Sequence, residues 1–340
     1  MAVGLLVSIG ACSGTGSTTS RPTGPEVTVG TFPISQRLVT YSLEYCATAP
    51  IDQTSATIER IVVAIQAGDR SACGAADGIG AAAQAADVAD KTLIVAPHFP
   101  TVDAIPAGSG LLYWSDQGWS GGEDSLTTPD PRSWKISSFK AVDTLLADLV
   151  DSRRFPNLAS VAVAGFSAGG QFVNRYAALA RWRPKPGAGV SERFVIGSPS
   201  SYLYWDTARF SNGGFAPLTP AQVQACPNFN YYRYGLQYRT GYLGELTDAR
   251  LKDNYRSSHI RYLLGGTDAN PADGSLDVNC GAEWQGKQRV ERGQLYFDRL
   301  GAVFGTAVYD RQKLAVVPDV GHDGTGIYLS SQGRDALFGQ

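Results

Sequence analysis

The sequence has no excess of charge of one sign. Its 340 residues carry 29 lysines and arginines against 31 aspartates and glutamates, for a formal net charge of −2, and no basic tract interrupts this balance. Nucleic-acid binding depends on clustered lysine and arginine side chains that neutralise phosphates. We therefore expect no nucleic acid among the partners of this protein.

Histidine is scarce, with only His98, His259 and His322 in the whole chain. No two of them stand at a spacing typical of metal ligands, and the cysteines do not cluster with them. We expect no metal and no organic cofactor. The scarcity also limits any search for a catalytic imidazole to three positions.

A hydrophobic run long enough to span a bilayer is missing. The apolar N-terminus, MAVGLLVSIGA, has only eleven residues before Cys12, about half of what a transmembrane helix needs. Residues 9–12 nevertheless resemble the lipobox of bacterial lipoproteins, in which the cysteine is lipidated, although the positively charged start of an export signal is missing. Residues 13–26 are typical of a flexible tether. We expect a protein secreted, or attached through Cys12, at the bacterial cell envelope.

Cysteines are few and odd in number, with five in the chain. If Cys12 carries lipid, the other four can form two disulfides in an oxidising compartment. Proximity in the sequence favours Cys46–Cys73 and Cys226–Cys280 among the three connectivities. Four buried free thiols are the alternative.

From residue 27 onward, apolar strand-like runs alternate with helix-like stretches. Residues 27–34 and 37–45 are typical of an antiparallel pair, and the later runs are β-branched and apolar enough for strands buried on both faces. This alternation predicts an α/β fold, with a mostly parallel twisted sheet flanked by helices. We expect one domain over residues 27–340, and we expect the protein to be monomeric. The later strands are expected at 58–67, 92–99, 160–167, 193–201, 260–268 and 313–324, and helices at 78–91, 137–153, 171–182 and 286–304.

The most informative motif is Gly165-Phe166-Ser167-Ala168-Gly169, which is G-x-S-x-G. It follows a strand-like segment and precedes a helix-like one, the setting in which a serine hydroxyl stands exposed on a sharp turn as a nucleophile. Glycine suits both crowded positions of that turn, and the helix N-terminus favours negative charge beside the serine. The alternative is a glycine-rich turn whose serine only caps the helix.

A serine nucleophile needs a base, and position in the fold separates the three histidines. In a parallel sheet, chemistry gathers at the carboxyl ends of the strands. His322 follows a strand in a glycine-rich turn and is the preferred base. His98 also lies at the carboxyl end of a strand but precedes the serine in the chain, and it remains the alternative. His259 begins a strand and is expected at the opposite edge.

The third residue must be a carboxylate that orients the imidazole. Asp268 lies in the turn that ends the run at 260–268 and is the preferred residue. Asp273 and Asp277, further along the same loop, are the alternatives.

The order Ser167, Asp268, His322 is the order of the α/β-hydrolase superfamily, and the sequence resembles that superfamily over residues 30–335. Within it, the chain is similar to secreted serine esterases of the polyhydroxybutyrate-depolymerase-like and feruloyl-esterase-like kinds. The resemblance implies an oxyanion hole made by the N–H groups of Ala168 and Gly68, with Asp69 as the alternative to Gly68. The usual His-Gly before that donor is replaced here by Gln66-Ala67.

Aromatic residues concentrate in two regions, residues 110–122 and 202–257, that we interpret as parts of the substrate site. Residues 202–257 form a long aromatic, loop-rich insertion that is interpreted as a cap, with a subdomain covering a sheet edge as the alternative. The candidate substrate-binding residues are Tyr113, Trp114, Trp119, Tyr202 and Trp205. Packing in the core is the alternative for each.

These features together predict an exported serine hydrolase that cleaves small or polymeric carboxylic esters through an acyl-enzyme. The same three residues would also serve a serine peptidase or a cell-envelope acyltransferase. An inactive binding protein on a hydrolase scaffold is the non-enzymatic alternative.

Overall fold

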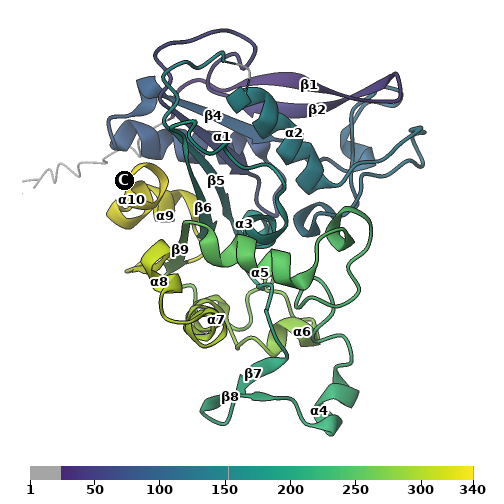
Figure 1. The fold of residues 1–340 in the computed structure, drawn as a ribbon, viewed down its shortest axis with the longest axis vertical. Helices are drawn as coiled ribbons and strands as arrows, with labels where there is room; N and C mark the ends of the chain where they lie inside the picture. The colour runs from purple at the N-terminus through teal and green to yellow at the C-terminus, as the bar shows by residue number, and fades with distance from the viewer. Residues whose placement is uncertain (1–23, 152, 340) are drawn as a thin grey trace, which may run out of the picture.

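The computed structural model describes residues 24–151 and 153–339, and the lipobox-like segment with Cys12 lies outside that part. Its centre is an eight-stranded sheet in the order β1-β2-β4-β3-β5-β6-β9-β10 (Figure 1). The strands are β1 (Thr28–Gln36), β2 (Val39–Ala47), β3 (Arg60–Ile65), β4 (Thr92–Pro97), β5 (Ser160–Phe166), β6 (Ser191–Gly197), β9 (Ile260–Gly265) and β10 (Gln312–Val317).

The sheet is parallel from β4 to β10 and antiparallel at the β1–β2 edge. The two-residue turn of the β1–β2 hairpin, Arg37-Leu38, has φ values of 48° and 68°, as expected for a turn matched to strand twist. The expected antiparallel pair and mostly parallel sheet are both confirmed. Because the six parallel strands run in one direction, their carboxyl ends meet at one edge.

Helices cover both faces of this sheet. Successive strand residues point to opposite faces, so Ile61 and Val63 contribute to one buried cluster while Val62 and Ala64 contribute to the other. The first face carries α2 (Ser138–Asp151), α3 (Ala168–Leu179), α5 (Asp248–Ser257), α7 (Arg289–Phe304) and α8 (Val308–Arg311). The second carries α1 (Ala72–Ala85), α9 (Gly324–Leu329) and α10 (Ser331–Phe338).

Helix α1 begins six residues before the expected start at residue 78. Ser71 caps it, because the Ser71 hydroxyl accepts a hydrogen bond from the Gly74 N–H over 3.0 Å. Gly74 lies in the part of the helix that the expectation missed, and glycine weakens a helical pattern in the sequence, which explains the misplaced boundary. Short 3-10 helices lie at Ala89–Lys91, Val102–Ala104, Trp119–Gly121 and Gly241–Gly244.

Residues 202–257 contain regular structure of two kinds. The β7 (Ala208–Ser211) and β8 (Gly214–Pro217) hairpin and α4 (Pro220–Ala225) lie at the end of the molecule away from the β1–β2 hairpin (Figure 1). Helix α5, by contrast, belongs to the layer that covers the sheet, where Leu251 and Tyr255 are fully buried. A covering role over the site stays a prediction for this insertion.

Two disulfides join the expected pairs, Cys46–Cys73 and Cys226–Cys280. The first links β2 to the start of α1. The second links the end of α4 to α6 (Cys280–Glu283), which follows the loop after β9. The insertion is therefore covalently tied to the loop that leaves the carboxyl end of β9.

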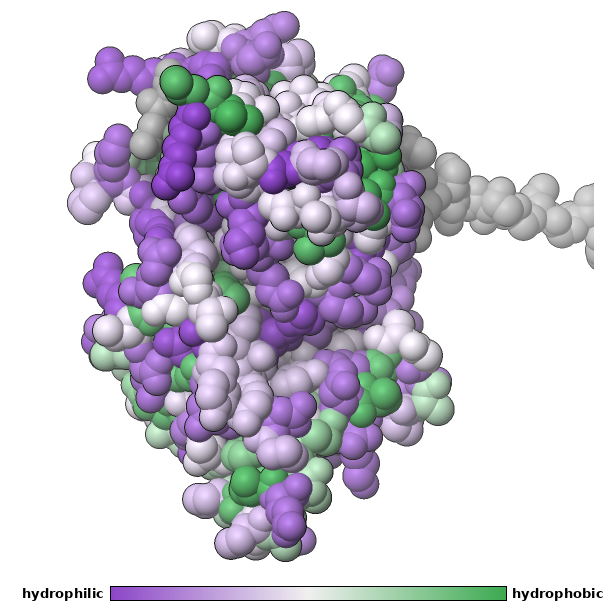
Figure 2. Space-filling model, turned by 90° about the vertical axis from the view of Figure 1, so that its right-hand side faces the viewer, coloured by the Kyte–Doolittle hydropathy of each residue, from purple (hydrophilic) through white to green (hydrophobic). Residues whose placement is uncertain are grey.

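On the face shown in Figure 2, hydrophobic residues form small separate groups among polar ones. Large hydrophobic side chains with the greatest exposure are scattered, for example Leu38 in the hairpin turn and Val278. No helix within residues 24–151 and 153–339 is long and apolar enough to cross a membrane.

Candidate active site

Three strand ends bring Ser167, His322 and Asp268 into one hydrogen-bonded series. Ser167 follows β5, Asp268 follows β9 and His322 follows β10. The Nε2 atom of His322 lies 2.9 Å from the Ser167 hydroxyl oxygen, and its Nδ1 atom lies 2.7 Å from Oδ2 of Asp268. This is the geometry in which a neutral imidazole donates to the carboxylate and accepts from the hydroxyl.

The turn at Ser167 holds the hydroxyl in place through an unusual backbone conformation. Ser167 has φ 56° and ψ −117°, a region that non-glycine residues rarely adopt. A Cβ atom on Gly165 would lie 2.4 Å from the carbonyl oxygen of Gly169, and one on Gly169 would lie 2.6 Å from the Gln66 carbonyl oxygen. The two glycines of the motif are therefore required by close backbone approach, as the sequence predicted.

The two expected oxyanion donors lie next to each other. Ala168 is the first residue of α3, so its N–H has no carbonyl partner within the helix. A Cβ atom built on Gly68 would lie 4.0 Å from the Cβ of Ala168. The alternative, Asp69, uses its carboxylate to accept from the Ser71 N–H at 3.2 Å.

Gln66, which stands where the superfamily usually has histidine, anchors this loop. It is fully buried, and its side chain pairs with both backbone groups of Phe99: Oε1 accepts from the N–H over 3.1 Å, and Nε2 donates to the carbonyl over 3.3 Å. These two hydrogen bonds to the segment after β4 fix the start of the loop that carries Gly68.

A buried arginine behind Asp268 is the part of the site that the sequence did not reveal. Arg289, at the start of α7, has 1% of its surface exposed, and its Nη1 atom donates to Oδ1 of Asp268 over 3.3 Å. The same guanidinium bonds to Ser200, Ser275 and Asp273. Asp268, itself 5% exposed, thus meets a histidine on one oxygen and a cation on the other.

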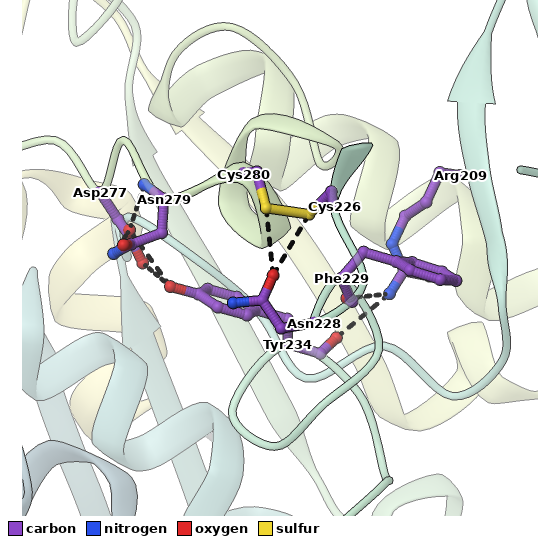
Figure 3. Close-up of a disulfide and its surroundings, with 8 residues drawn as sticks. All are labelled: Arg209, Cys226, Asn228, Phe229, Tyr234, Asp277, Asn279 and Cys280. Carbon is purple, nitrogen blue, oxygen red and sulfur yellow. Dashed lines mark hydrogen bonds between the residues drawn. A yellow bond between two sulfur atoms is a disulfide. The ribbon is translucent and has the colours of Figure 1, made fainter. Parts of the chain in front are cut away.

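The two alternative carboxylates have other partners. Hydrogen bonds from the hydroxyl and N–H of Ser275, with the nearby Arg289 guanidinium, lower the pKa of Asp273 to about 2. Asp277 accepts from the Tyr234 hydroxyl at 3.0 Å and from the Asn279 amide at 2.8 Å, beside the Cys226–Cys280 disulfide (Figure 3). His322 bonds to Asp268 and to neither of these two carboxylates, so the geometry favours Asp268.

The other two histidines lie elsewhere. His98, at the end of β4, pairs through Nδ1 with Oε2 of Glu44 at 2.6 Å. His259 lies at the amino end of β9, as expected, where its Nε2 is 2.9 Å from an Arg311 nitrogen. Burial, and then the Arg311 charge, lower the pKa of His259.

The expected aromatic wall is corrected by the structure. The five side chains proposed for it are at most 3% exposed and lie within the core rather than around an open site: Tyr113, Trp114, Trp119, Tyr202 and Trp205. Trp114 and Trp119 contact the ring of Phe99, and Trp205 donates from Nε1 to the Tyr296 hydroxyl at 3.0 Å. Large aromatic rings gain most by leaving water, and the packing alternative therefore holds.

Within residues 24–151 and 153–339, no three histidine, cysteine, aspartate or glutamate side chains gather as metal ligands would. The expectation of a site without metal stays a prediction.

Comparison with solved structures shows the α/β-hydrolase fold. A poly(aspartic acid) hydrolase from Sphingomonas sp. KT-1 is similar at 21% identity and a TM-score of 0.59, with 91% of this chain and 98% of that one covered. A poly(3-hydroxybutyrate) depolymerase from Bordetella parapertussis is similar at 21% identity and a TM-score of 0.55, covering 88% and 86%. No family model and no curated protein matches the sequence. The predicted resemblance is thus confirmed at the level of the fold.

Proposed function

We propose that this protein is a serine hydrolase that cleaves carboxylic esters through an acyl-enzyme. The observation that carries the proposal is the series Ser167–His322–Asp268, with its distances of 2.9 Å and 2.7 Å. Its members have the relation of nucleophile, base and orienting carboxylate.

The chemistry follows from these positions. The Ser167 oxygen attacks the ester carbonyl while His322 takes the hydroxyl proton, and Asp268 stabilises the imidazolium. The imidazolium then gives its proton to the leaving alcohol oxygen as the ester C–O bond breaks. Water attacks the acyl-enzyme with the same proton route in the second half, releasing the acid and free Ser167.

The Ala168 and Gly68 N–H groups are proposed to stabilise the negative oxygen that forms in both steps. Loss of one such donor costs about 3 kcal/mol of transition-state stabilisation in comparable enzymes. The Gln66–Phe99 pairing supports this role, because a preformed donor loop needs no rearrangement when charge develops.

The similar structures support a hydrolase, and their names point to two kinds of acyl bond, an amide and an ester. One of those proteins is named for hydrolysis of poly(aspartic acid), an amide polymer, and the other for a polyester. We propose an ester as the substrate of this chain. Two disulfides support an oxidising location, and secretion or attachment through Cys12 is part of the proposal.

The first test compares Ser167→Ala with Ser35→Ala, whose hydroxyl lies in the exposed β1–β2 hairpin. We expect Ser167→Ala to lose p-nitrophenyl butanoate turnover by at least about 10⁴-fold, and Ser35→Ala to keep it. Full esterase activity in Ser167→Ala would refute the assignment.

A second assay separates the alternative chemistries on the same site. Faster cleavage of aminoacyl anilides than of esters would identify a peptidase, and ester formation with an added alcohol would identify an acyltransferase. A folded protein that does not react with a fluorophosphonate would instead be a binding protein.

A further inference from the structure

The loop between β3 and α1, which carries the proposed oxyanion donor Gly68, closes on itself as a tight turn. The Arg70 N–H donates to the Ala67 carbonyl over 3.1 Å, and this bond makes residues 67–70 a β-turn with Gly68 at its second position. The N–H at that position takes no part in the bond that closes the turn. The orientation of the turn therefore decides where this donor points.

Arg70 has an unfavourable backbone conformation in this turn. Its φ is 60°, in the left-handed region that glycine adopts without steric cost and that arginine rarely adopts. Such a conformation persists where the surrounding structure holds it. At Arg70 the restraint comes from the hydrogen bonds of the side chain, which is 17% exposed.

The Arg70 side chain joins the turn to two other segments. Its Nη1 atom donates to the Phe99 carbonyl over 3.2 Å, and its Nη2 atom donates to the carbonyl of Asp116 and, over 2.7 Å, to Oδ1 of the same residue. The Phe99 carbonyl oxygen also accepts from Nε2 of Gln66. Gln66 comes directly before the turn and Arg70 ends it, so both ends of the turn that carries Gly68 are bound to one oxygen atom.

Phe99 is a rigid point of attachment because it lies in the core. It is fully buried, and its ring packs on Phe172 with centroids 5.5 Å apart, in addition to its contacts with Trp114 and Trp119. Phe172 lies on α3, the helix that begins at Ala168. The two proposed oxyanion donors are therefore held relative to one residue, one through the hydrogen bonds of its loop and the other through the packing of its helix.

The two bonding partners of Arg70 differ in their exposure to water. The Asp116 side chain is 76% exposed, and an ion pair in water contributes little. Phe99 has no exposed surface, so water does not compete for the bond to its carbonyl. The bond to Phe99 is therefore the one that fixes the turn.

We propose, on the basis of the function proposed above, that Arg70 is a positioning residue for the oxyanion hole. Together with Gln66, it holds the turn on the Phe99 carbonyl so that the Gly68 N–H is directed at the oxygen that becomes negative. Arg70 acts through Gly68 rather than on the substrate itself.

The test begins with Arg70→Met, which removes the donors and keeps a long side chain. We expect kcat for p-nitrophenyl butanoate to fall about 10–30-fold with KM within about twofold, because the negative oxygen forms only after substrate has bound. Arg70→Lys should lose only about three- to fivefold, since an ammonium group can reach one of the two partners. Asp116→Ala, which keeps the backbone carbonyl, should lose at most about twofold.

Arg181→Met is the matched control for the loss of an arginine. Arg181 also donates from one nitrogen to a carboxylate, that of Glu245 at 2.5 Å, and from the other to a carbonyl, that of Tyr242 at 2.7 Å. It lies beyond the C-terminal end of α3, away from the oxyanion donors. Its kcat should stay within about twofold of the wild type, and thermal unfolding shows whether each variant is folded at the assay temperature.

A transition-state analogue distinguishes a positioning role from a general weakening of the fold. In 1,1,1-trifluoropentan-2-one, the Ser167 oxygen adds to the ketone carbon, His322 takes the hydroxyl proton, and the ketone oxygen becomes an oxyanion with no group to expel. We expect its Ki in Arg70→Met to rise by about the factor by which kcat/KM falls. The Ki of pentan-2-one, which has the same chain and forms no stable adduct, should stay within about twofold.

The outcomes separate this inference from the proposed function. If folded Arg70→Met keeps kcat within twofold, or if both ketones or neither change in Ki, the positioning role is wrong. If Arg70→Met does not fold, Arg70→Lys decides: a rise of threefold or more in Ki for the trifluoroketone alone supports the role, and any other result refutes it. A wild type that neither cleaves the ester nor reacts with a fluorophosphonate would instead refute the proposed function.

Discussion

The protein contains two histidine–carboxylate pairs that resemble each other closely. His322 and Asp268 meet at 2.7 Å, and His98 and Glu44 at 2.6 Å; both contacts use Nδ1, and both histidine side chains are 19% exposed. Both histidines follow strands at the same sheet edge. An imidazole held by a carboxylate is therefore not, by itself, a sign of catalysis.

The difference lies in what surrounds each pair. His322 has the Ser167 hydroxyl on its other nitrogen, whereas no serine, threonine or cysteine of the described chain is seen bonded to the His98 ring. The Asp268 side chain is 4% exposed and paired with Arg289, whereas that of Glu44 is 29% exposed.

His98 extends the pairing between two strands. Its N–H donates to the Glu44 carbonyl at 2.8 Å, just beyond the β2–β4 ladder, so side chain and backbone together join these strands. The comparison therefore supports the catalytic role that we propose for the His322–Asp268 pair and favours a structural role for the His98–Glu44 pair.

Replacing the two histidines should give the largest contrast. We expect His322→Ala to lower kcat for p-nitrophenyl butanoate by about 10⁴–10⁶-fold, because the nucleophile loses its base. His98→Ala should stay within about threefold. A similar loss in both variants would break the comparison.

Replacing each carboxylate with an amide should give the next-largest contrast in kcat. Asp268→Asn is expected to lower kcat by about 10³–10⁴-fold, since an amide favours the wrong imidazole tautomer. Glu44→Gln should leave kcat nearly unchanged. Steady-state kinetics on both variants, with circular dichroism to check folding, decide the matter.

Arg289 sharpens the comparison further, because only the Asp268 pair has a buried cation. Arg289→Met should destabilise the fold by about 3–5 kcal/mol, as expected when a buried carboxylate loses its ionic partner. Arg289→Lys, which keeps the charge, should remain folded and lower kcat by about tenfold with little change in KM, because Asp268 is held less firmly. An unchanged kcat in a folded Arg289→Lys variant would mean that Arg289 acts on stability alone.

The two disulfides should matter least for catalysis. Replacing either pair of cysteines with serine should cost about 3–4 kcal/mol in the free energy of unfolding. The Cys226–Cys280 bridge spans 54 residues against 27 for Cys46–Cys73, so its loss should cost about 0.6 kcal/mol more. Guanidinium titrations measure both losses, and a reversed order would contradict the loop-length argument.

Much of the fold and the core of the site followed from the sequence because the signals were local. Alternating strand and helix patterns gave the parallel sheet, and strand ends then placed Ser167, Asp268 and His322 at one edge. The glycines at 165 and 169 signalled the tight turn, which the close backbone approach explains.

The rest depended on packing between distant segments. Arg289 lies on α7, far from Ser167 in the chain, and an arginine in an amphipathic helix shows no local sign of burial. Tryptophan and tyrosine occur both in the walls of binding sites and in cores, and only the structure shows that Trp114 and Tyr202 are buried. Tyr328 lies on α9, a six-residue helix that the hydrophobic pattern did not predict.

The most direct test of the central claim is mass spectrometry of the folded protein after reaction with a fluorophosphonate. We predict one adduct, on the peptide containing Ser167, formed quickly by the wild type and by His98→Ala and at least about 10³-fold more slowly by His322→Ala. An adduct on another residue, or equal labelling rates in the two histidine variants, would contradict the assignment of Ser167 and His322 as nucleophile and base.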